Sequence, residues 1–292
     1  MNAMNRRNQT ALGRAFDIFN HGFFVFMMIL MLFPILYVAV GSVSSTGLFN
    51  FVFGQFSVEA YISIIRSART LRALMNSFLI TLVGTAMCMI VTSLSAYGLS
   101  KKSLPGRRFF MRVVIIFMLF NPGLIPTYIW EGVKLNLIDT YWALWLPCLI
   151  SSFNLIVMKN FFEQLPDSIE ESARIDGCNE LQSFITIVIP MSLAAIATFS
   201  LFYAVGFWNN YARPMIFLNN PSKWPITIWL KQVIIMSKGG FTDDLPEMMR
   251  VWAPEPAVKY ATIVAATLPI LLVYPFLQKY FAKGVLLGSI KG

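Results

Sequence analysis

Histidine and cysteine are scarce in this sequence of 292 residues, which contains one histidine and three cysteines. His21 alone supplies neither a histidine-based catalytic triad nor a metal centre. Cys88, Cys148 and Cys178 show no C-x-x-C spacing, which leaves zinc sites and disulfide frameworks without support. The phosphate-binding pattern G-x-x-x-x-G-K-[ST] is also absent. We therefore expect that the chain is not an enzyme and binds no metal or cofactor itself.

Charge is scarce as well. Charged residues make up 13% of the chain and hydrophobic residues 57%, whereas soluble domains average about 25% and about 45–50%. Most of this chain therefore cannot face water. The aromatic content of 15% and the 16 methionines exclude a disordered chain, collagen and a simple coiled coil. These numbers indicate an integral membrane protein.

Long runs without Asp, Glu, Lys or Arg give the number of membrane crossings. A bilayer is crossed by about 20 apolar residues in a helix, and a charge at its centre costs about 2.5–3.5 kcal/mol. The runs predict six transmembrane helices near residues 19–41, 76–99, 110–129, 139–160, 191–211 and 258–279. Polar and apolar residues do not alternate as they do in membrane β-barrels. The expected fold class is an all-α integral membrane protein with six transmembrane helices.

Basic residues predict the orientation of these helices. Arg6, Arg7 and Arg14 precede the first helix, and five more basic residues lie within 101–112. Such flanks favour the cytoplasmic side, and the first apolar run is too long for a signal peptide. The sequence thus predicts two cytoplasmic termini. It also predicts a cytoplasmic segment 1–18, a transmembrane domain 19–292, a cytoplasmic loop 163–190 and an external loop 212–257.

The net charge of +9 would suggest nucleic acid as a partner of a soluble protein. Here the basic residues lie beside the predicted helices, so anionic lipid headgroups explain them better. Those at the predicted outer side, Arg66, Arg69, Arg72 and Arg213, would also suit an acidic cargo. We expect membrane lipid, and no nucleic acid, as a partner.

The loop between the fourth and fifth predicted helices carries the most information. Ser168 and Glu171 have capping-box spacing and predict a helix start, while Gly177 predicts its end. The helix over 168–178 would present Ala173 and Gly177, two small residues four apart, to another surface. A second helical stretch is expected from Asn179 into Pro190 and the fifth transmembrane helix. An amphipathic interfacial connector is the alternative interpretation.

The same loop resembles a known pattern. Glu171-Ser172-Ala173, three residues, Gly177, nine residues and Ile187-Val188-Ile189-Pro190 resemble the EAA loop of ABC-importer permeases, E-A-A-x3-G-x9-I-x-L-P. Ser172 and Ile189 are departures from it. The resemblance implies that this segment couples the chain to an ATP-hydrolysing subunit. The residues that it assigns to coupling are Glu171, Ser172, Ala173, Asp176 and Gly177.

The resemblance covers essentially the whole chain. Residues 190–211 and 257–292 are similar to the fifth and last helices of maltose-type carbohydrate permeases, and most similar to the branch for lipo-oligosaccharide, aldouronate and alginate oligosaccharides. It implies a type I ABC importer in a bacterial inner membrane. The implied partners are a second related permease, two ATP-binding subunits that hold ATP and Mg, and an extracytoplasmic solute-binding protein. It also implies an ATPase contact at the C-terminal tail, Ser289, Ile290, Lys291 and Gly292, for which a frayed terminus is the alternative.

Aromatic residues suggest where an oligosaccharide and its binding protein would touch the chain. Trp224, Trp229 and Trp252 lie in the predicted external loop, which we expect to dock the binding protein. A re-entrant or interfacial helix that seals the outer mouth is the alternative. The candidate substrate path consists of Tyr203, Trp208, Asn209, Asn210 and Tyr211. Interfacial belts and helix packing use the same residue types.

Two other function classes fit the sequence less well. An ion-coupled secondary carrier needs ligands at mid-membrane, and the predicted helices contain no acidic residue there. A membrane-embedded enzyme needs a set of catalytic groups that this sequence does not assemble. The sequence therefore favours a permease subunit for oligosaccharides, with an acidic or a neutral cargo both open.

Overall fold

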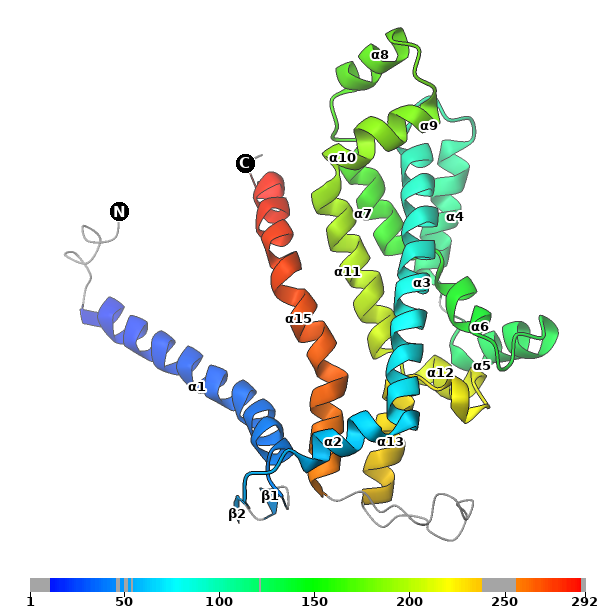
Figure 1. Ribbon diagram of the computed structural model, residues 1–292. Helices are drawn as coiled ribbons and strands as arrows, with labels where there is room; N and C mark the ends of the chain where they lie inside the picture. Colours follow the sequence, from blue (N-terminus) through cyan, green and yellow to red (C-terminus); the bar gives the residue numbers. More distant parts are fainter. Residues whose placement is uncertain are drawn as a thin grey trace. The chain divides into compact units, whose positions relative to one another are not determined.

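The computed structural model of the chain describes residues 11–45, 48–49, 52–53, 55–120, 122–237 and 256–289. These residues are mostly helical, with one hairpin of two-residue strands (Figure 1). The helical fold expected from the sequence is confirmed. The described chain forms two compact units, one of residues up to Arg66 with 233–265, the other of 67–232 with residues from Ala266 onward.

The first unit holds the N-terminal helix and a small core. Its elements are α1 (Ala11–Ser42), β1 (Leu48–Phe49), β2 (Val52–Phe53), α2 (Glu59–Arg66) and the first turns of α15 (Pro256–Ser289). Ala60 and Ile64 of α2 pack with Ala257 and Ala261 of α15. Apolar side chains are exposed along most of α1, which is how a membrane helix meets lipid or another membrane helix.

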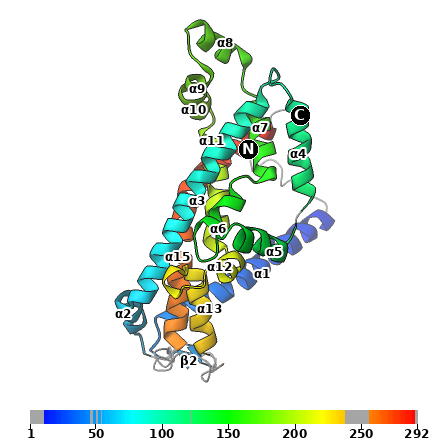
Figure 2. The same cartoon turned by 90° about the vertical axis from the view of Figure 1, so that its right-hand side faces the viewer.

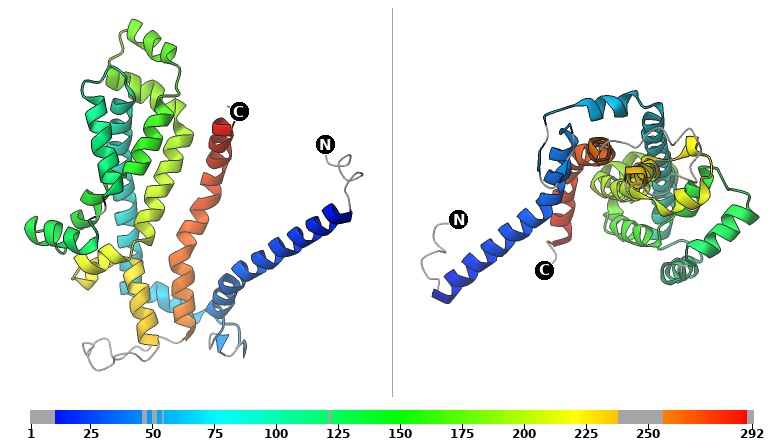
Figure 3. Two further views of the ribbon diagram at one scale, coloured as in Figure 1. Left: turned by 180° about the vertical axis from the view of Figure 1, so that it is seen from behind. Right: turned by 90° about the horizontal axis from the view of Figure 1, so that it is seen from below.

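The second unit contains most of the chain. Its elements are α3 (Ala68–Ser100), α4 (Arg107–Leu119), α5 (Leu124–Thr127), the π-helix η1 (Tyr128–Lys134), α6 (Trp142–Trp145), η2 (Leu146–Cys148), α7 (Ser152–Phe162), α8 (Asp167–Ile175), α9 (Glu180–Ser183), the π-helix η3 (Phe184–Val188), α10 (Ile189–Met191), α11 (Leu193–Asn209), α12 (Ala212–Phe217), η4 (Pro221–Lys223), most of α13 (Ile226–Ser237) and the later part of α15. Helices α4, α7 and α11 run alongside α3 (Figures 1 and 3).

Helix α3 packs directly against α11 in this unit. A Cβ added at Gly84 of α3 would lie 2.7 Å from Cζ of Phe207 on α11. Glycine therefore permits an approach that alanine would block. Cys88 and Ile80 of α3 continue this core with Tyr203 of α11.

Two of the described helices, Ala15–Ser42 and Ala68–Ser100, are each long and apolar enough to cross a membrane unbroken. They agree in position with the first two predicted helices. Three further crossings are formed only if bent pairs of helices are counted as one, which gives up to five by length and composition. A shorter apolar stretch, Ala257–Val273, lies within the continuous helix α15.

The membrane spans predicted over 110–129 and 139–160 are each built from two helical segments that meet at a bend. The first bends by 117° between α4 and the α5–η1 segment, where Pro122 lacks an N–H and Gly123 has a φ of +80°. The second bends by 47° before α7. Pro147 precedes this bend, and Ser151 caps a new helix by accepting a hydrogen bond from the Asn154 N–H.

The predicted fifth helix and the helical stretch before it do not form one continuous helix. The segment Glu180–Met191 meets α11 at 85°, and Ser192 between them has a non-helical backbone. The segment thus turns sharply where Pro190 and Ser192 interrupt regular helix. Helix α11 itself, Leu193–Asn209, closely matches the predicted span 191–211.

The predicted external loop 212–257 is largely helical where it is described. It contains α12, η4 and α13, and residues 238–255 lie outside the described residues. The Asn76 amide of α3 donates to the Ser222 carbonyl at 2.8 Å, and the Ser77 hydroxyl accepts from the Ile226 N–H at 2.8 Å. These bonds hold the start of α13 against α3.

Candidate functional site

The first candidate site is the short helix α8, which the sequence predicts as a coupling segment. It ends at Ile175, and Gly177 has a φ of +85°. The Cys178 N–H donates to the Ala173 carbonyl at 2.9 Å. This bond and the left-handed glycine form a Schellman cap, so the predicted role of Gly177 as the helix end is confirmed.

The start of α8 differs from the capping-box prediction. The helix begins at Asp167, so Ser168 lies in its first turn and is not the N-cap residue. A complete capping box is present instead at Asn179 and Gln182, which begin α9 (2.8 and 2.9 Å). The sequence predicts a helical stretch from Asn179 but not this capping box, although Asn179 and Gln182 have the same three-residue spacing as Ser168 and Glu171.

Most of the predicted coupling residues are exposed. Glu171, Ser172, Asp176 and Gly177 all face solvent, whereas Ala173 is buried. Ile175 is 86% exposed. The segment therefore combines carboxylates with an accessible apolar side chain, a surface suited to contact with another protein. It lies at one end of its unit, beyond α9 and α10 (Figure 2).

The base of this loop is fixed to the helices of its unit. Phe184 of η3 is buried and lies 4.9 Å from the Tyr97 ring of α3, centroid to centroid. Glu163, the first residue of the loop, forms ion pairs with Lys159 of α7 (2.7 Å) and with Arg107 of α4. These contacts join the base of the loop to α3, α4 and α7.

The second candidate site is a cavity of about 320 Å³ in the same unit, within the range of ligand pockets. It lies between α11 and the bend that precedes α7. Its lining residues are Cys148, Ile150, Ser151, Asn154, Phe202, Tyr203, Gly206, Phe207 and Asn210. Aromatic rings beside amide and hydroxyl groups suit a sugar, which offers both apolar ring faces and hydroxyls.

Hydrogen bonds fix some polar groups of the cavity and leave others available. The Tyr203 hydroxyl lies 2.7 Å from Thr92 Oγ1 and accepts from the Ser151 N–H at 3.2 Å. Asn154 is 6% exposed, and its carboxamide has no hydrogen-bond partner among the described residues. Because Asn154 lines the cavity, its carboxamide is placed to bind a polar ligand.

The candidate substrate-path residues separate into two groups. Tyr203 and Asn210 line the cavity, whereas the other three do not. The Trp208 indole N–H donates to the Ala266 carbonyl at 3.0 Å in a packed core. Asn209 is exposed, and the Tyr211 hydroxyl contacts Lys231.

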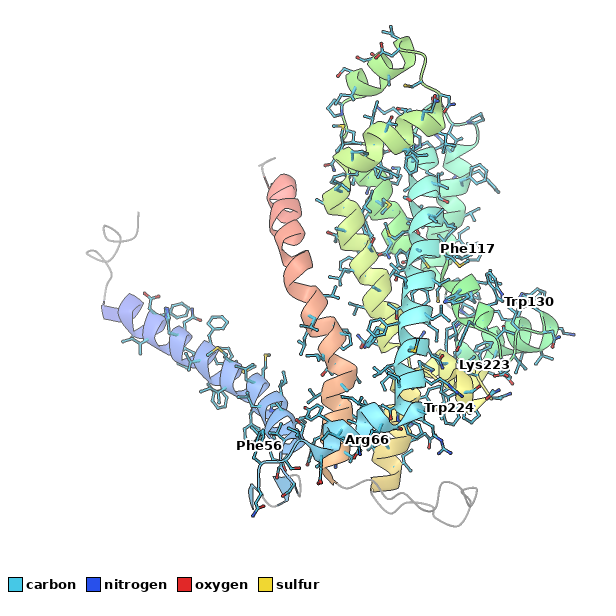
Figure 4. The ribbon with its side chains drawn as sticks, viewed as in Figure 1. Phe56, Arg66, Phe117, Trp130, Lys223 and Trp224 are labelled. Carbon is cyan, nitrogen blue, oxygen red and sulfur yellow. The ribbon has the colours of Figure 1, made fainter. Side chains whose placement is uncertain are left out.

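The tryptophans expected to contact a binding protein are placed differently from one another. The Trp224 indole N–H donates to the Leu218 carbonyl and that of Trp229 to Thr70 Oγ1, both at 2.9 Å. Both indoles thus hold α12, α13 and α3 together, and Figure 4 shows Trp224 beside Lys223 near α13. Trp252 and the tail residues Ile290, Lys291 and Gly292 lie outside the described residues, and α15 ends at Ser289.

Sequence reasoning missed seven of the nine cavity residues, the polar Ser151 and Asn154 among them, and one ion pair. Ser151 and Asn154 interrupt an otherwise apolar run, a polar signal that points to a lined space. Arg213, treated as a free outer cation, forms a partly buried ion pair with Glu131. The partners lie 82 positions apart, so no local pattern relates them. Among the described residues no cluster of three or more His, Cys, Asp or Glu side chains is arranged to hold a metal ion.

Comparison with known proteins adds independent evidence. The profile of a family described as binding-protein-dependent transport system inner membrane component matches residues 10–287. The polygalacturonan/rhamnogalacturonan transport system permease protein YtcP of Bacillus subtilis (strain 168) is 46% identical over 285 residues, covering 96% of this chain and 99% of YtcP. Protein LplC of the same organism is 44% identical over 297 residues, covering all of both chains.

A solved structure is similar over the same length. It is described as a bacterial ABC transporter involved in the import of the acidic polysaccharide alginate. The similar chain is 29% identical, with a TM-score of 0.84, and the match covers 94% of this chain and 99% of the other. Both the sequence and the fold thus relate this chain to membrane transport subunits.

Proposed function

Because the chain belongs to the family of binding-protein-dependent transport system inner membrane components, it is a non-catalytic permease subunit of the inner membrane, and we propose that it imports oligosaccharides, including acidic ones. The observation that carries this proposal is the near full-length similarity to YtcP and to the chain of the alginate importer. Energy for transport comes from the hydrolysis of ATP, which partner subunits bind together with Mg.

The proposed topology has six membrane crossings with both termini in the cytoplasm. The unbroken helices α1 and α3, the three bent pairs and α15 supply the crossings. Helix α8 then lies on the cytoplasmic side, together with the basic segment 101–112. The segment from α12 to residue 257 lies outside and docks the solute-binding protein.

The proposed coupling element is α8, which contacts one of two ATP-binding subunits, while a second related permease completes the path. Support comes from the exposed Glu171 and Asp176 and from the Schellman cap, which keeps α8 short and rigid. The tail from Ser289 to Gly292 is a second proposed ATPase contact.

The proposed sugar contact is the cavity beside α11. A substitution at Gly206 tests it, because a Cβ there meets no atom within 4 Å and a larger side chain would enter the cavity. We expect Gly206→Leu to lower oligosaccharide uptake by the reconstituted complex about tenfold, the equivalent of about 1.4 kcal/mol of lost binding.

Gly22→Leu is the matched control, since Gly22 is also helical and its Cβ also meets nothing within 4 Å. ATP hydrolysis without binding protein should be the same in both variants and in the wild type. Equal uptake by Gly206→Leu and Gly22→Leu would contradict the cavity as the sugar contact. Failure of every oligosaccharide to stimulate the wild-type complex would contradict the proposed cargo.

A further inference from the structure

The wall of the cavity carries no charge, although a strong cation lies just behind it. None of the nine lining residues is Asp, Glu, Lys or Arg. Arg213 of α12 follows the lining residue Asn210 by three positions, and its N–H donates to Asn210 Oδ1 at 3.3 Å. The cation is thus attached to the wall through its own backbone.

The guanidinium group also contacts the segment that leads to the lining residue Cys148. Its Nη2 atom donates to the Ala143 carbonyl at 3.3 Å, and Ala143 belongs to α6, which leads through η2 to the lining residue Cys148. Arg213 and Glu131 both lie close enough to act electrostatically on the Cys148 thiol. A net charge on this pair would therefore be felt inside the cavity.

Glu131 cancels that charge. Its carboxylate pairs with Arg213, and the two side chains are only 15% and 17% exposed. Glu131 belongs to the π-helix η1, a distortion that is frequent at functional sites. The pair of Lys223 with Asp139 is nearby in sequence but more exposed, at 37% and 31%.

The bonding capacity of Arg213 is not filled by this partner. A guanidinium has five N–H donors, and the buried Arg213 Nε has no hydrogen-bond partner among the described residues. The buried Phe217 ring lies 5.2 Å from its central carbon. Arg213 would therefore attract another anion strongly if Glu131 were neutral.

We propose that Glu131 sets the charge preference of the cavity by neutralising Arg213. This inference rests on the proposed function, in which the cavity contacts the oligosaccharide. With the ion pair intact, the cavity binds sugar hydroxyls and ring faces. It then has the same affinity for acidic and for neutral oligosaccharides. Without the Glu131 charge the cavity becomes positive and favours acidic oligosaccharides.

The test uses Cys148 as a reporter of the potential inside the cavity. In the reconstituted complex, Cys148 is labelled with a negatively charged sulfonatoethyl and with a positively charged trimethylammonioethyl methanethiosulfonate, and mass spectrometry follows its rate. Glu131→Gln should raise the ratio of negative to positive rates about tenfold, the effect of one poorly screened unit charge. Arg213→Gln should lower it, and the double variant should restore it.

Asp139→Asn is the matched control, since it removes a carboxylate from the more exposed ion pair and should leave the ratio unchanged. Uptake of an oligogalacturonide relative to its carboxyl-reduced form should follow the labelling ratio in all variants. If Cys148 is labelled with the same ratio of rates in the wild type, Glu131→Gln and Arg213→Gln, the proposed role of Glu131 is wrong. The proposed sugar contact at the cavity is not affected by that result. If Cys148 reacts with neither reagent in the wild type, the cavity is not accessible to water-soluble molecules. That result would contradict the cavity as the sugar contact as well.

Discussion

Asp139 shows how one residue organises the polar turn that follows η1. Its φ is +58°, in the left-handed region that Asp and Asn enter more readily than other side chains. Its Oδ1 accepts from the Asn220 N–H and its Oδ2 from Lys223 Nζ, both at 3.0 Å. The Asn220 N–H, followed by the Lys223 ammonium, lowers the pKa of this carboxyl below its ordinary value. Asp139 thus joins the turn to η4.

The lowered pKa predicts a pH dependence of stability. A carboxyl with a lower pKa in the folded than in the unfolded protein stabilises the fold above its unfolded pKa of about 3.9. This stabilisation is lost as the pH falls through the folded pKa. We expect Asp139→Asn to lower the thermal midpoint of the detergent-solubilised protein at pH 7, and the difference to disappear toward pH 3. A difference that stays constant from pH 7 to pH 3 would contradict this account.

Helices in this protein are shaped by contacts that small residues permit and by breaks that prolines impose. Gly84 brings α3 against Phe207 of α11, while Pro122 and Pro147 accompany the two bends. Close packing through small residues stabilises helix pairs in membranes, where no hydrophobic effect drives them together. The α3–α11 contact therefore positions the α11 side of the cavity.

Gly84→Ala tests this contact. The added methyl would lie under 3 Å from the Phe207 ring, so the ring or the helix must shift. Overpacking of this kind costs about 1–3 kcal/mol, and we expect a lower thermal midpoint in detergent. Phe207→Leu combined with Gly84→Ala should recover part of the loss. An unchanged midpoint for Gly84→Ala would show that α11 does not rely on this approach.

The proposed coupling is a property of the whole molecule, because α8 (Asp167–Ile175) contributes no residue to the cavity and is connected to it through α7 and α11, which carry lining residues. Phe184 and Glu163 fix the base of the loop to α3, α4 and α7, whereas Glu171 and Asp176 on α8 stay exposed. A substitution on α8 should therefore leave the fold intact and act on transport alone.

Glu171→Lys and Gly177→Val test the coupling role. The first reverses an exposed charge, and the second places a β-branched residue at a φ of +85°, which costs about 1–2 kcal/mol and loosens the cap of α8. We expect both to abolish uptake and binding-protein-stimulated ATP hydrolysis while the thermal midpoint changes little. Gln164→Lys, exposed in the same loop but outside α8, is the control. Normal uptake by Glu171→Lys and Gly177→Val would exclude α8 as the coupling element.

Local chemistry explains what could be predicted. The apolar runs predicted α1, α3 and α11, because helix formation and membrane burial depend on contiguous side chains. The end of α8 at Gly177 followed from the same logic, since a left-handed cap needs glycine. Pro122 and Pro147 favour kinks in the third and fourth predicted helices, but the angle of each bend could not be predicted, because a proline in a membrane helix is compatible with both a mild kink and a sharp bend.

By itself the sequence determined that the chain is a helical membrane protein with a polar, partly helical loop before α11, since composition, run length and motif spacing are properties of neighbouring residues. Only the tertiary structure decided which polar groups share a cavity and which charges cancel. Asn154, Tyr203 and Asn210 line the same cavity, and Glu131 pairs with Arg213. Asn154 and Glu131 lie tens of residues from these partners in the sequence, and only the packing of α7, α11, α12 and η1 brings them together.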